Sequence, residues 1–145
     1  TTGIKFRVWL ATIAIFAATF VLGITNWNSF EWPALVRWTI GPALIVAGNA
    51  FAWMGVRKIG HGATSGEVAE LKTDGLYRYS RNPQYVADMA ILIGWAILSA
   101  SGWAAIIAVV GVLVLASALL AEEPWLEDTY GADYKTYKSK VPRYI

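Results

Sequence analysis

The first of two polar segments that could do chemistry is centred on Arg81, which directly precedes Asn82 and Pro83. Asn favours the N-cap of a helix and Pro its first position, so the pair predicts a helix that begins at Pro83. The first backbone N–H groups of that helix would lie free beside Arg81. A helix N-terminus next to a guanidinium binds a carboxylate or a phosphate. The alternative is a capped helix with Arg81 at the lipid headgroups.

The second polar segment begins with the adjacent carboxylates of Glu122 and Glu123, which follow a long apolar stretch. We expect the helix formed by that stretch to end at this pair, where acidic side chains oppose the helix dipole unless something positive docks. Two carboxylates there suit a ligand ammonium, a ribose diol or a sulfonium. The alternatives are a solvated helix end, or pairing with Arg78 or Arg81.

Two further polar residues lie inside apolar stretches. Asp88 follows Tyr85 by three positions, so both lie on one helix face, and an acid just inside a membrane span is a functional candidate. We predict that Tyr85 and Asp88 are catalytic and that Asp88 holds or deprotonates an amine; the alternative is pairing of Asp88 with Arg78 or Lys72. Asn49 is predicted to contact the substrate headgroup, although an interhelical hydrogen bond is the commoner role of such a residue.

The composition of the 145-residue chain indicates an integral membrane protein. Hydrophobic residues make up 57% and charged residues 15%, with a mean hydropathy of +0.47, whereas soluble domains are about 45–50% apolar and about 25% charged. Cysteine is absent and histidine occurs once, at position 61, which excludes a disulfide framework, a thiolate nucleophile and a histidine-based metal site. The net charge of +2 and the scattered basic residues give no nucleic-acid patch.

Four apolar stretches, at about residues 8–24, 34–56, 86–98 and 103–121, predict the elements that position these residues. A membrane span needs about 20 apolar residues, so we expect an all-α bundle of about four transmembrane helices in a single domain, residues 1–145. The third stretch is short, and residues 99–102 predict a tight helical hairpin. That hairpin returns the chain to one membrane face, where the loop 57–84 and the tail 122–145 would together form a pocket.

Basic residues predict the orientation, because they concentrate on the cytoplasmic side of membrane proteins. They precede the first stretch, fill the loop 57–84 and follow the fourth stretch, whereas the other two connections have none. Both termini and the pocket are therefore expected in the cytoplasm, in a prokaryotic inner membrane. Arg37 is the exception, and we expect its side chain to snorkel to the membrane surface. A signal peptide is a less favoured reading of residues 8–24.

The spacing of the polar residues resembles that of one known superfamily. The segment 74–85, the Glu122-Glu123 pair with Leu126, and the tail pattern Tyr130-Gly131…Tyr134…Tyr137…Val141-Pro142 resemble isoprenylcysteine carboxyl methyltransferases and phospholipid methyltransferases. The resemblance implies a membrane-embedded methyltransferase that uses S-adenosylmethionine, releases S-adenosylhomocysteine and binds the cofactor on the cytoplasmic side. The cofactor-binding positions that it implies are Leu71, Gly75, Tyr77, Arg81, Asn82, Pro83, Tyr85, Glu122 and Glu123.

Two departures from the superfamily pattern bear on the acceptor. Asn82 stands where the superfamily often has His, which removes any acid–base role at that position. The stretch 112–121 lacks the basic residue by which eukaryotic prenylcysteine enzymes are thought to meet the substrate carboxylate. A phospholipid amine, a small amine or a thiol is therefore as plausible an acceptor as an isoprenylcysteine carboxylate. Additional cofactor contacts are possible from His61, Trp53 and Trp125.

Three other classes of protein compete with this interpretation. An NADPH-dependent membrane reductase of the sterol-reductase kind resembles the superfamily in its C-terminal half, but such chains have more spans. A small multidrug transporter needs an acidic residue within its first span, and residues 8–24 contain none. A purely structural four-helix protein leaves the polar loop and the Glu pair without a role. The oligomeric state stays open.

Overall fold

The computed structural model describes residues 2–59 and 71–145. Its elements are α1 (Thr2–Thr25), the π-helical turn η1 (Val36–Ile40), α2 (Gly41–Ile59), the 3-10 turn η2 (Gly75–Arg78), α4 (Pro83–Ser99) and α5 (Gly102–Lys140). The described residues contain no β-strand, which confirms the predicted all-α class. Each of the four apolar stretches lies within or largely within one of the long helices.

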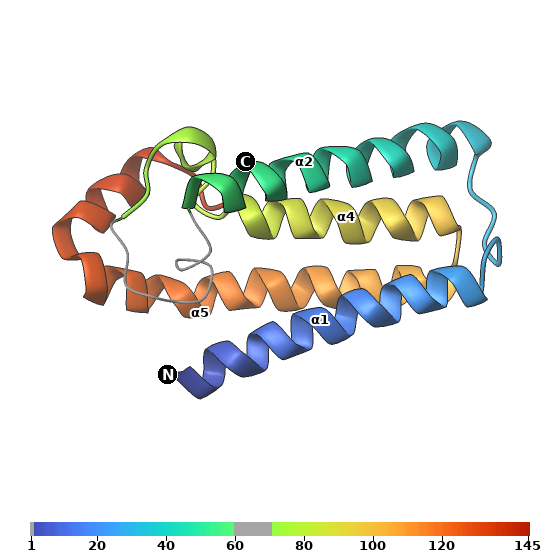
Figure 1. Ribbon diagram of the computed structural model, residues 1–145, viewed down its shortest axis with the longest axis horizontal. Coiled ribbons are helices and arrows are strands. Elements are labelled where there is room, and N and C mark those ends of the chain that lie inside the picture. The colour runs from blue at the N-terminus through green and yellow to red at the C-terminus, as the bar shows by residue number, and fades with distance from the viewer. Residues whose placement is uncertain (1, 60–70) are drawn as a thin grey trace.

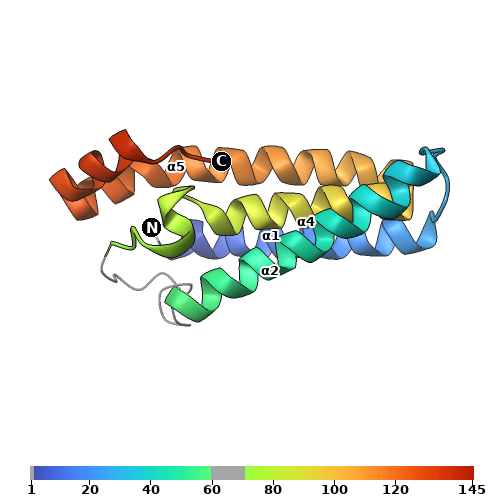
Figure 2. The same cartoon turned by 90° about the horizontal axis from the view of Figure 1, so that it is seen from above.

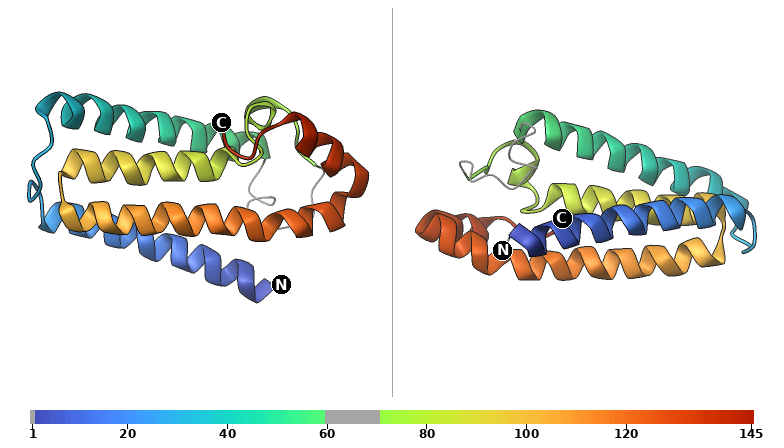
Figure 3. Two further views of the ribbon diagram at one scale, coloured as in Figure 1. Left: turned by 180° about the vertical axis from the view of Figure 1, so that it is seen from behind. Right: turned by 60° about the horizontal axis from the view of Figure 1, so that its bottom comes forward.

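The four long helices lie side by side, with α4 at the centre (Figures 1 and 2). Helix α4 contacts α2, α5 and α1, and the two N-terminal helices pack on different sides of the α4–α5 hairpin. The buried core between α4 and α5 is built from the apolar side chains of Leu92, Ala96, Ala108 and Leu115. Towards its N-terminus, α1 diverges from the other helices (Figure 3).

Glycines bring α2 close to α4. A Cβ added at Gly94 would lie 2.8 Å from the carbonyl oxygen of Gly41, and one at Gly48 would lie 2.8 Å from the carbonyl oxygen of Ala87. Small residues of this kind let helix backbones approach closely, which is how helices associate within a membrane. The peripheral helix α2 is thereby held against α4.

The turn between α4 and α5 is as tight as the sequence predicts. Ala100 adopts a left-handed conformation (φ 49°) that ends α4, and the Ser101 hydroxyl accepts a hydrogen bond of 3.2 Å from the Ala104 N–H at the start of α5. An N-capping Ser next to a left-handed residue closes a helical hairpin in two residues. The ends of α4 and α5 that carry the polar segments are thus brought together.

Membrane-spanning character is clearest for α5. Among the described residues it is the one helix long and apolar enough to cross a bilayer, while Trp9–Thr25 and Pro83–Ser99 form shorter apolar helices. Many large apolar side chains on α1, α2 and α5 are exposed, including Trp9, Trp53 and Leu113. The prediction of four spans remains a prediction.

Arg37 does not snorkel, so that expectation is wrong. Its side chain is buried, with Nε donating to the carbonyl of Leu98 at 2.9 Å and Nη1 donating to Asn28 Oδ1. The rings of Trp27 and Trp38 each lie 5.1 Å from the guanidinium carbon. Cation–π contacts and a carbonyl oxygen therefore replace the water that a snorkelling side chain would reach.

The loop before η1 explains why Arg37 turns inward. The N–H groups of Asn28 and Phe30 donate to the carbonyls of Ser99 and Ala100, at 2.9 and 2.8 Å, so this loop lies on the α4–α5 turn. The pairing is tertiary and has no local signature in the sequence.

Candidate functional site

The two polar segments lie together at one end of the bundle, where η2 and the start of α4 face the last part of α5 (Figure 1). The α4–α5 hairpin places them there, because it returns the chain to the end from which α4 begins. Helix α5 then turns at Gly131, whose φ of 54° and ψ of −125° suit glycine alone. The segment after Gly131 runs back towards the loop that contains Arg81.

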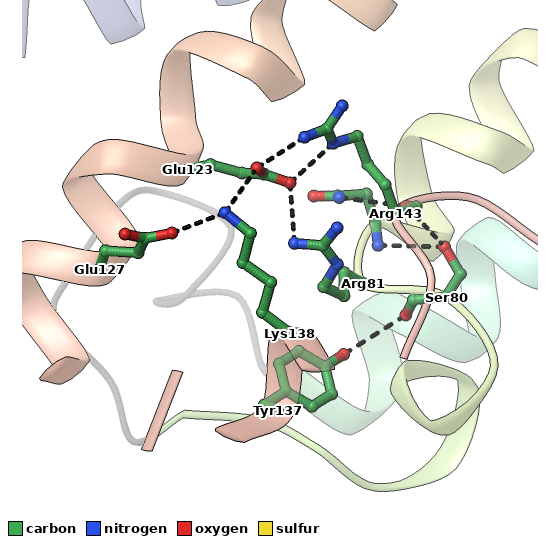
Figure 4. A network of polar contacts seen from close by, with 8 residues as sticks. Ser80, Arg81, Glu123, Glu127, Tyr137, Lys138 and Arg143 are labelled. Carbon is green, nitrogen blue, oxygen red and sulfur yellow. Dashed lines mark hydrogen bonds and ion pairs between the residues drawn. The ribbon is translucent and has the colours of Figure 1, made fainter. Parts of the chain in front are cut away.

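Glu123 is the centre of the site and is surrounded by three cations (Figure 4). Arg143 holds it in a bidentate pair, Nε to Oε1 and Nη2 to Oε2, both at 2.7 Å. Nη1 of Arg81 lies 2.8 Å from Oε1 and Nζ of Lys138 lies 3.3 Å from Oε2. Lys138 also pairs with Glu127 at 2.6 Å. Three cations against two carboxylates leave the cluster with one surplus positive charge.

The cations keep Glu123 ionised. Its pKa is lowered to about 2, by the hydrogen bond from Arg143 and the charges of Arg81 and Lys138, against the opposing effect of burial. Only 8% of the side-chain surface of Glu123, and of Arg81, is exposed. A buried pair of this kind costs desolvation that its partners must offset, so removal of one partner is strongly felt.

The expected dipole conflict at the Glu pair is wrong. The helix does not end there but continues past Pro124 to the kink at Gly131, so Glu122 and Glu123 lie in helix interior and not at exposed C-terminal carbonyls. The positive groups that Glu123 attracts come from the chain itself. Pairing with Arg81 was among the alternatives considered, and that pair is present.

Some polar atoms in this cluster have no hydrogen-bond partner among the described residues. They are Nε and Nη1 of Arg81 and the hydroxyl of Tyr134, all of them buried. The contact between Arg81 and Glu123 is therefore an ion pair without hydrogen-bond alignment. Nη1 of Arg81 has the charge of Glu123 beside it, whereas Nε has no partner, like Nη2 of Arg37 at the other end of the bundle.

One of the two predictions for the start of α4 is confirmed and the other is wrong. Pro83 is the first helical residue, but the Asn82 side chain does not cap the helix. Instead Asn82 Nδ2 donates to the carbonyl of Arg143 at 3.3 Å, and the Asn82 N–H donates to Ser80 Oγ at 3.1 Å. The capping role is lost because the returning tail offers Asn82 a tertiary acceptor.

The hydroxyl of Tyr137 holds the η2 loop. Tyr137 donates to the carbonyl of Tyr77 at 2.7 Å. Burial raises the pKa of Tyr77 to about 12 and raises the pKa of Tyr137 as well, so both phenols stay protonated at neutral pH. Gly75 begins η2 with a φ of 61°, a conformation in which glycine is favoured. The described end of the loop is thus tied to the tail.

Tyr85 and Glu122 form a second contact between α4 and α5. The Tyr85 hydroxyl donates to Glu122 Oε1 at 2.7 Å. Asp88, one turn further along α4, is half-buried and makes no ion pair with Arg78 or Lys72, all of which the structure describes. Glu122 and Asp88 are therefore two further acidic residues beside the Glu123 cluster.

Several predicted residues lie apart from these contacts. The Asn49 side chain is exposed and donates to the carbonyl of Ile45 on its own helix at 2.8 Å, so the expected interhelical bond is wrong. Trp53 is exposed, and both Trp125 and Leu71 are half-buried. His61 lies outside the described residues.

Sequence reasoning missed five residues of the site: Ser80, Tyr134, Tyr137, Lys138 and Arg143. The tail tyrosines were part of the recognised pattern without a role, and the basic tail residues were used only to predict orientation. The signal that could have found the two cations is the run of basic residues Lys135, Lys138, Lys140 and Arg143, which contains no acidic residue and follows the Glu122-Glu123 pair.

Comparison with known proteins defines the class. Residues 36–133 match the model of the phospholipid methyltransferase family, and the chain belongs to that family. This confirms the predicted superfamily and makes the chain a methyltransferase of a membrane-associated family; it does not favour a reductase or a transporter. No curated protein and no solved structure matches the chain.

Proposed function

We propose that this chain transfers a methyl group from S-adenosylmethionine to a lipophilic or membrane-associated acceptor. The observation that carries the proposal is the Glu123 cluster, with its surplus positive charge and its unused buried donors, within a phospholipid methyltransferase family chain. The chain supplies polar residues for both charged groups of the cofactor's methionine part, the carboxylate and the ammonium.

The donor set fits the cofactor. A methionine carboxylate would accept from Nε and Nη1 of Arg81 and from the Tyr134 hydroxyl, and would neutralise the surplus charge. Glu122 supplies a carboxylate for the ammonium group or the ribose diol. The superfamily resemblance supports cofactor binding by Leu71, Gly75, Tyr77, Arg81, Asn82, Pro83, Tyr85, Glu122 and Glu123, and we add Tyr134 from its position beside Arg81.

The residues on α4 would serve the acceptor. The bound cofactor supplies an already activated methyl group, so the protein's part is proximity and alignment. An amine acceptor must lose a proton, and Asp88, with Tyr85 one turn before it, is the group we propose to hold or take that proton. Contact of Asn49 with the substrate headgroup stays a prediction.

We base the proposed methyl acceptor and the proposed location of the protein on its family and on its exposed apolar side chains. A phospholipid amine, an isoprenylcysteine carboxylate or a small amine or thiol would enter sideways between helices, while the cofactor enters from water. The positive residues around Glu123 support a cytoplasmic location for this end of the bundle. The small size of the chain supports a prokaryotic inner membrane.

Calorimetric titration of S-adenosylhomocysteine into detergent-solubilised protein tests the proposal. The variant Arg81→Gln should lose binding, whereas Arg78→Gln, an exposed neighbour on η2, should bind as the wild type does. Circular dichroism shows whether each variant is folded. A folded wild type that binds neither S-adenosylhomocysteine nor S-adenosylmethionine, or that binds NADPH instead, would overturn the proposal. Radiolabelled methyl transfer to a panel of lipid and amine acceptors then identifies the substrate.

A further inference from the structure

The last five residues of the chain, 141–145, cross the loop that carries Arg81; we call them the strap. The Arg81 N–H donates to the carbonyl of Pro142 at 3.0 Å. The carbonyl of Arg143 accepts from Ser80 Oγ and from Asn82 Nδ2, each at 3.3 Å. The strap therefore lies directly on the segment that we propose binds the cofactor.

The strap is held differently from the helical segment before it. In that segment the side chains of Tyr134 and Tyr137 are 2% and 7% exposed, so apolar burial anchors it. The strap is held to the Arg81 loop by three hydrogen bonds to its backbone carbonyls, to the helix before it by the Val141 N–H bond to the Tyr137 carbonyl, and to α5 by the Arg143–Glu123 pair; Ile145 is 86% exposed. Segments held mainly by polar contacts can open locally without unfolding of the packed core.

The closed strap seals the donors that a cofactor needs. Nε and Nη1 of Arg81 and the Tyr134 hydroxyl are shielded from solvent. Arg143, in contrast, is 32% exposed and covers the buried Glu123 from the solvent side. An incoming carboxylate cannot reach Arg81 in this arrangement unless a neighbouring segment moves, and the strap contacts the Arg81 loop directly.

We propose that the strap is a gate for the cofactor site, with Arg143 as its latch on Glu123. The inference rests on the proposed function, because it concerns access to the same site. When the strap opens, Arg143 leaves Glu123 for solvent while Arg81 and Lys138 continue to neutralise the carboxylate. When it closes over bound cofactor, it shuts water out of the site.

Covalent closure tests the gate, and the absence of cysteine from the chain makes the chemistry selective. Tyr79→Cys, two residues before Arg81, and Pro142→Cys, at the residue whose carbonyl accepts the Arg81 N–H, are both at exposed positions and are bridged with a bifunctional thiol reagent. Bridging before mixing should slow association of S-adenosylhomocysteine at least about tenfold, and bridging after loading should slow its release by a similar factor. Unchanged rates in both orders would overturn the gate, while binding by the unbridged variant would leave the proposed function standing.

Hydrogen exchange at the Arg81 amide tests the gate without any cofactor. Arg143→Gln should speed this exchange at least about tenfold and leave the amides of the α4 interior unchanged. Lys140→Gln, an exposed basic residue just before the strap, is the matched control and should change nothing. If the Arg81 amide exchanges only as slowly as the α4 interior in the wild type and in Arg143→Gln, the strap does not open locally and the gate is wrong, whatever the outcome of the binding measurements.

Discussion

Each end of the helix bundle buries an arginine, and the two ends accommodate its charge in different ways. At one end Arg81 faces the carboxylate of Glu123, together with two more cations from the tail. At the other end Arg37 rests on a carbonyl, an amide oxygen and two Trp rings, with no carboxylate in ion-pair range among the residues that the structure describes.

The difference distinguishes a candidate binding site from a structural contact. The groups around Glu123 come from the loop before α4 and from the tail, and they carry a surplus positive charge. Those around Arg37 fasten the loop before η1 to the α4–α5 turn. The Glu123 end should therefore respond to pH and ligand, and the Arg37 end should respond to neither.

Removing the carboxylate should have the largest effect. Glu123→Gln leaves three cations close together without their shared anion, so we expect the free energy of unfolding to fall by about 3–5 kcal/mol. Denaturant unfolding in detergent, followed by Trp fluorescence, measures the change. The control Glu127→Gln removes a more exposed carboxylate and should cost far less. Equal losses in the two variants would mean that Glu123 is not the centre of the cluster.

Lowering the pH should destabilise the Glu123 end of the bundle and leave the Arg37 end unaffected. The pKa of Glu123 is about 2 in the folded chain and ordinarily 4.5, so folding favours its ionised form. Stability from this group is present above pH 4.5 and is lost as the pH falls from about 4.5 towards about 2, for a total of about 3 kcal/mol. The unfolding midpoint, measured against pH, should fall less steeply in Glu123→Gln than in the wild type. Parallel curves would contradict the assignment.

Removing the other buried arginine should have a smaller and strictly local effect. Arg37→Leu loses hydrogen bonds to Leu98 and Asn28 but also removes the unpaired Nη2, so we expect a loss of about 2 kcal/mol. Exchange of the Phe30 amide should become faster while S-adenosylhomocysteine affinity stays as in the wild type. Arg7→Leu, an exposed position on α1, is the control. A loss of cofactor binding in Arg37→Leu would break the contrast between the two ends.

The smallest effect is expected from a single hydroxyl at the Glu123 end. Tyr137→Phe removes the hydrogen bond to the carbonyl of Tyr77 while keeping the ring, so the free energy of unfolding should fall by about 1 kcal/mol. Tyr79→Phe alters an exposed ring and should be neutral. The two variants are compared by denaturant unfolding under identical conditions. Equal changes in the free energy of unfolding would show that the Tyr137 hydroxyl does not stabilise the fold.

Features encoded by local periodicity were predictable. The four apolar stretches became helices because each is long enough to form one, and Pro83 begins α4 because its missing N–H is not needed there. The turn at residues 99–102 was predictable from its small residues. The meeting of the two polar segments followed from the return of the hairpin.

Contacts between distant segments were not predictable. Asn82 bonds to the tail instead of capping its helix, and Arg37 turns inward because the loop before η1 docks on the α4–α5 turn. The role of Arg143 depends on a change of direction at Gly131 that returns the tail to α4. In each case the deciding partner is far away in sequence, so residue type and spacing alone held no information about it.

The sequence by itself therefore determined the helices, the superfamily and which polar segments share one end of the bundle, because these depend on apolar periodicity and on a recognisable spacing of residues. Only the tertiary structure decided which charges pair. The energy of an ion pair depends on distance and burial, and both are settled by the way the tail folds back after Gly131. That return places Arg143 and Lys138 on Glu123.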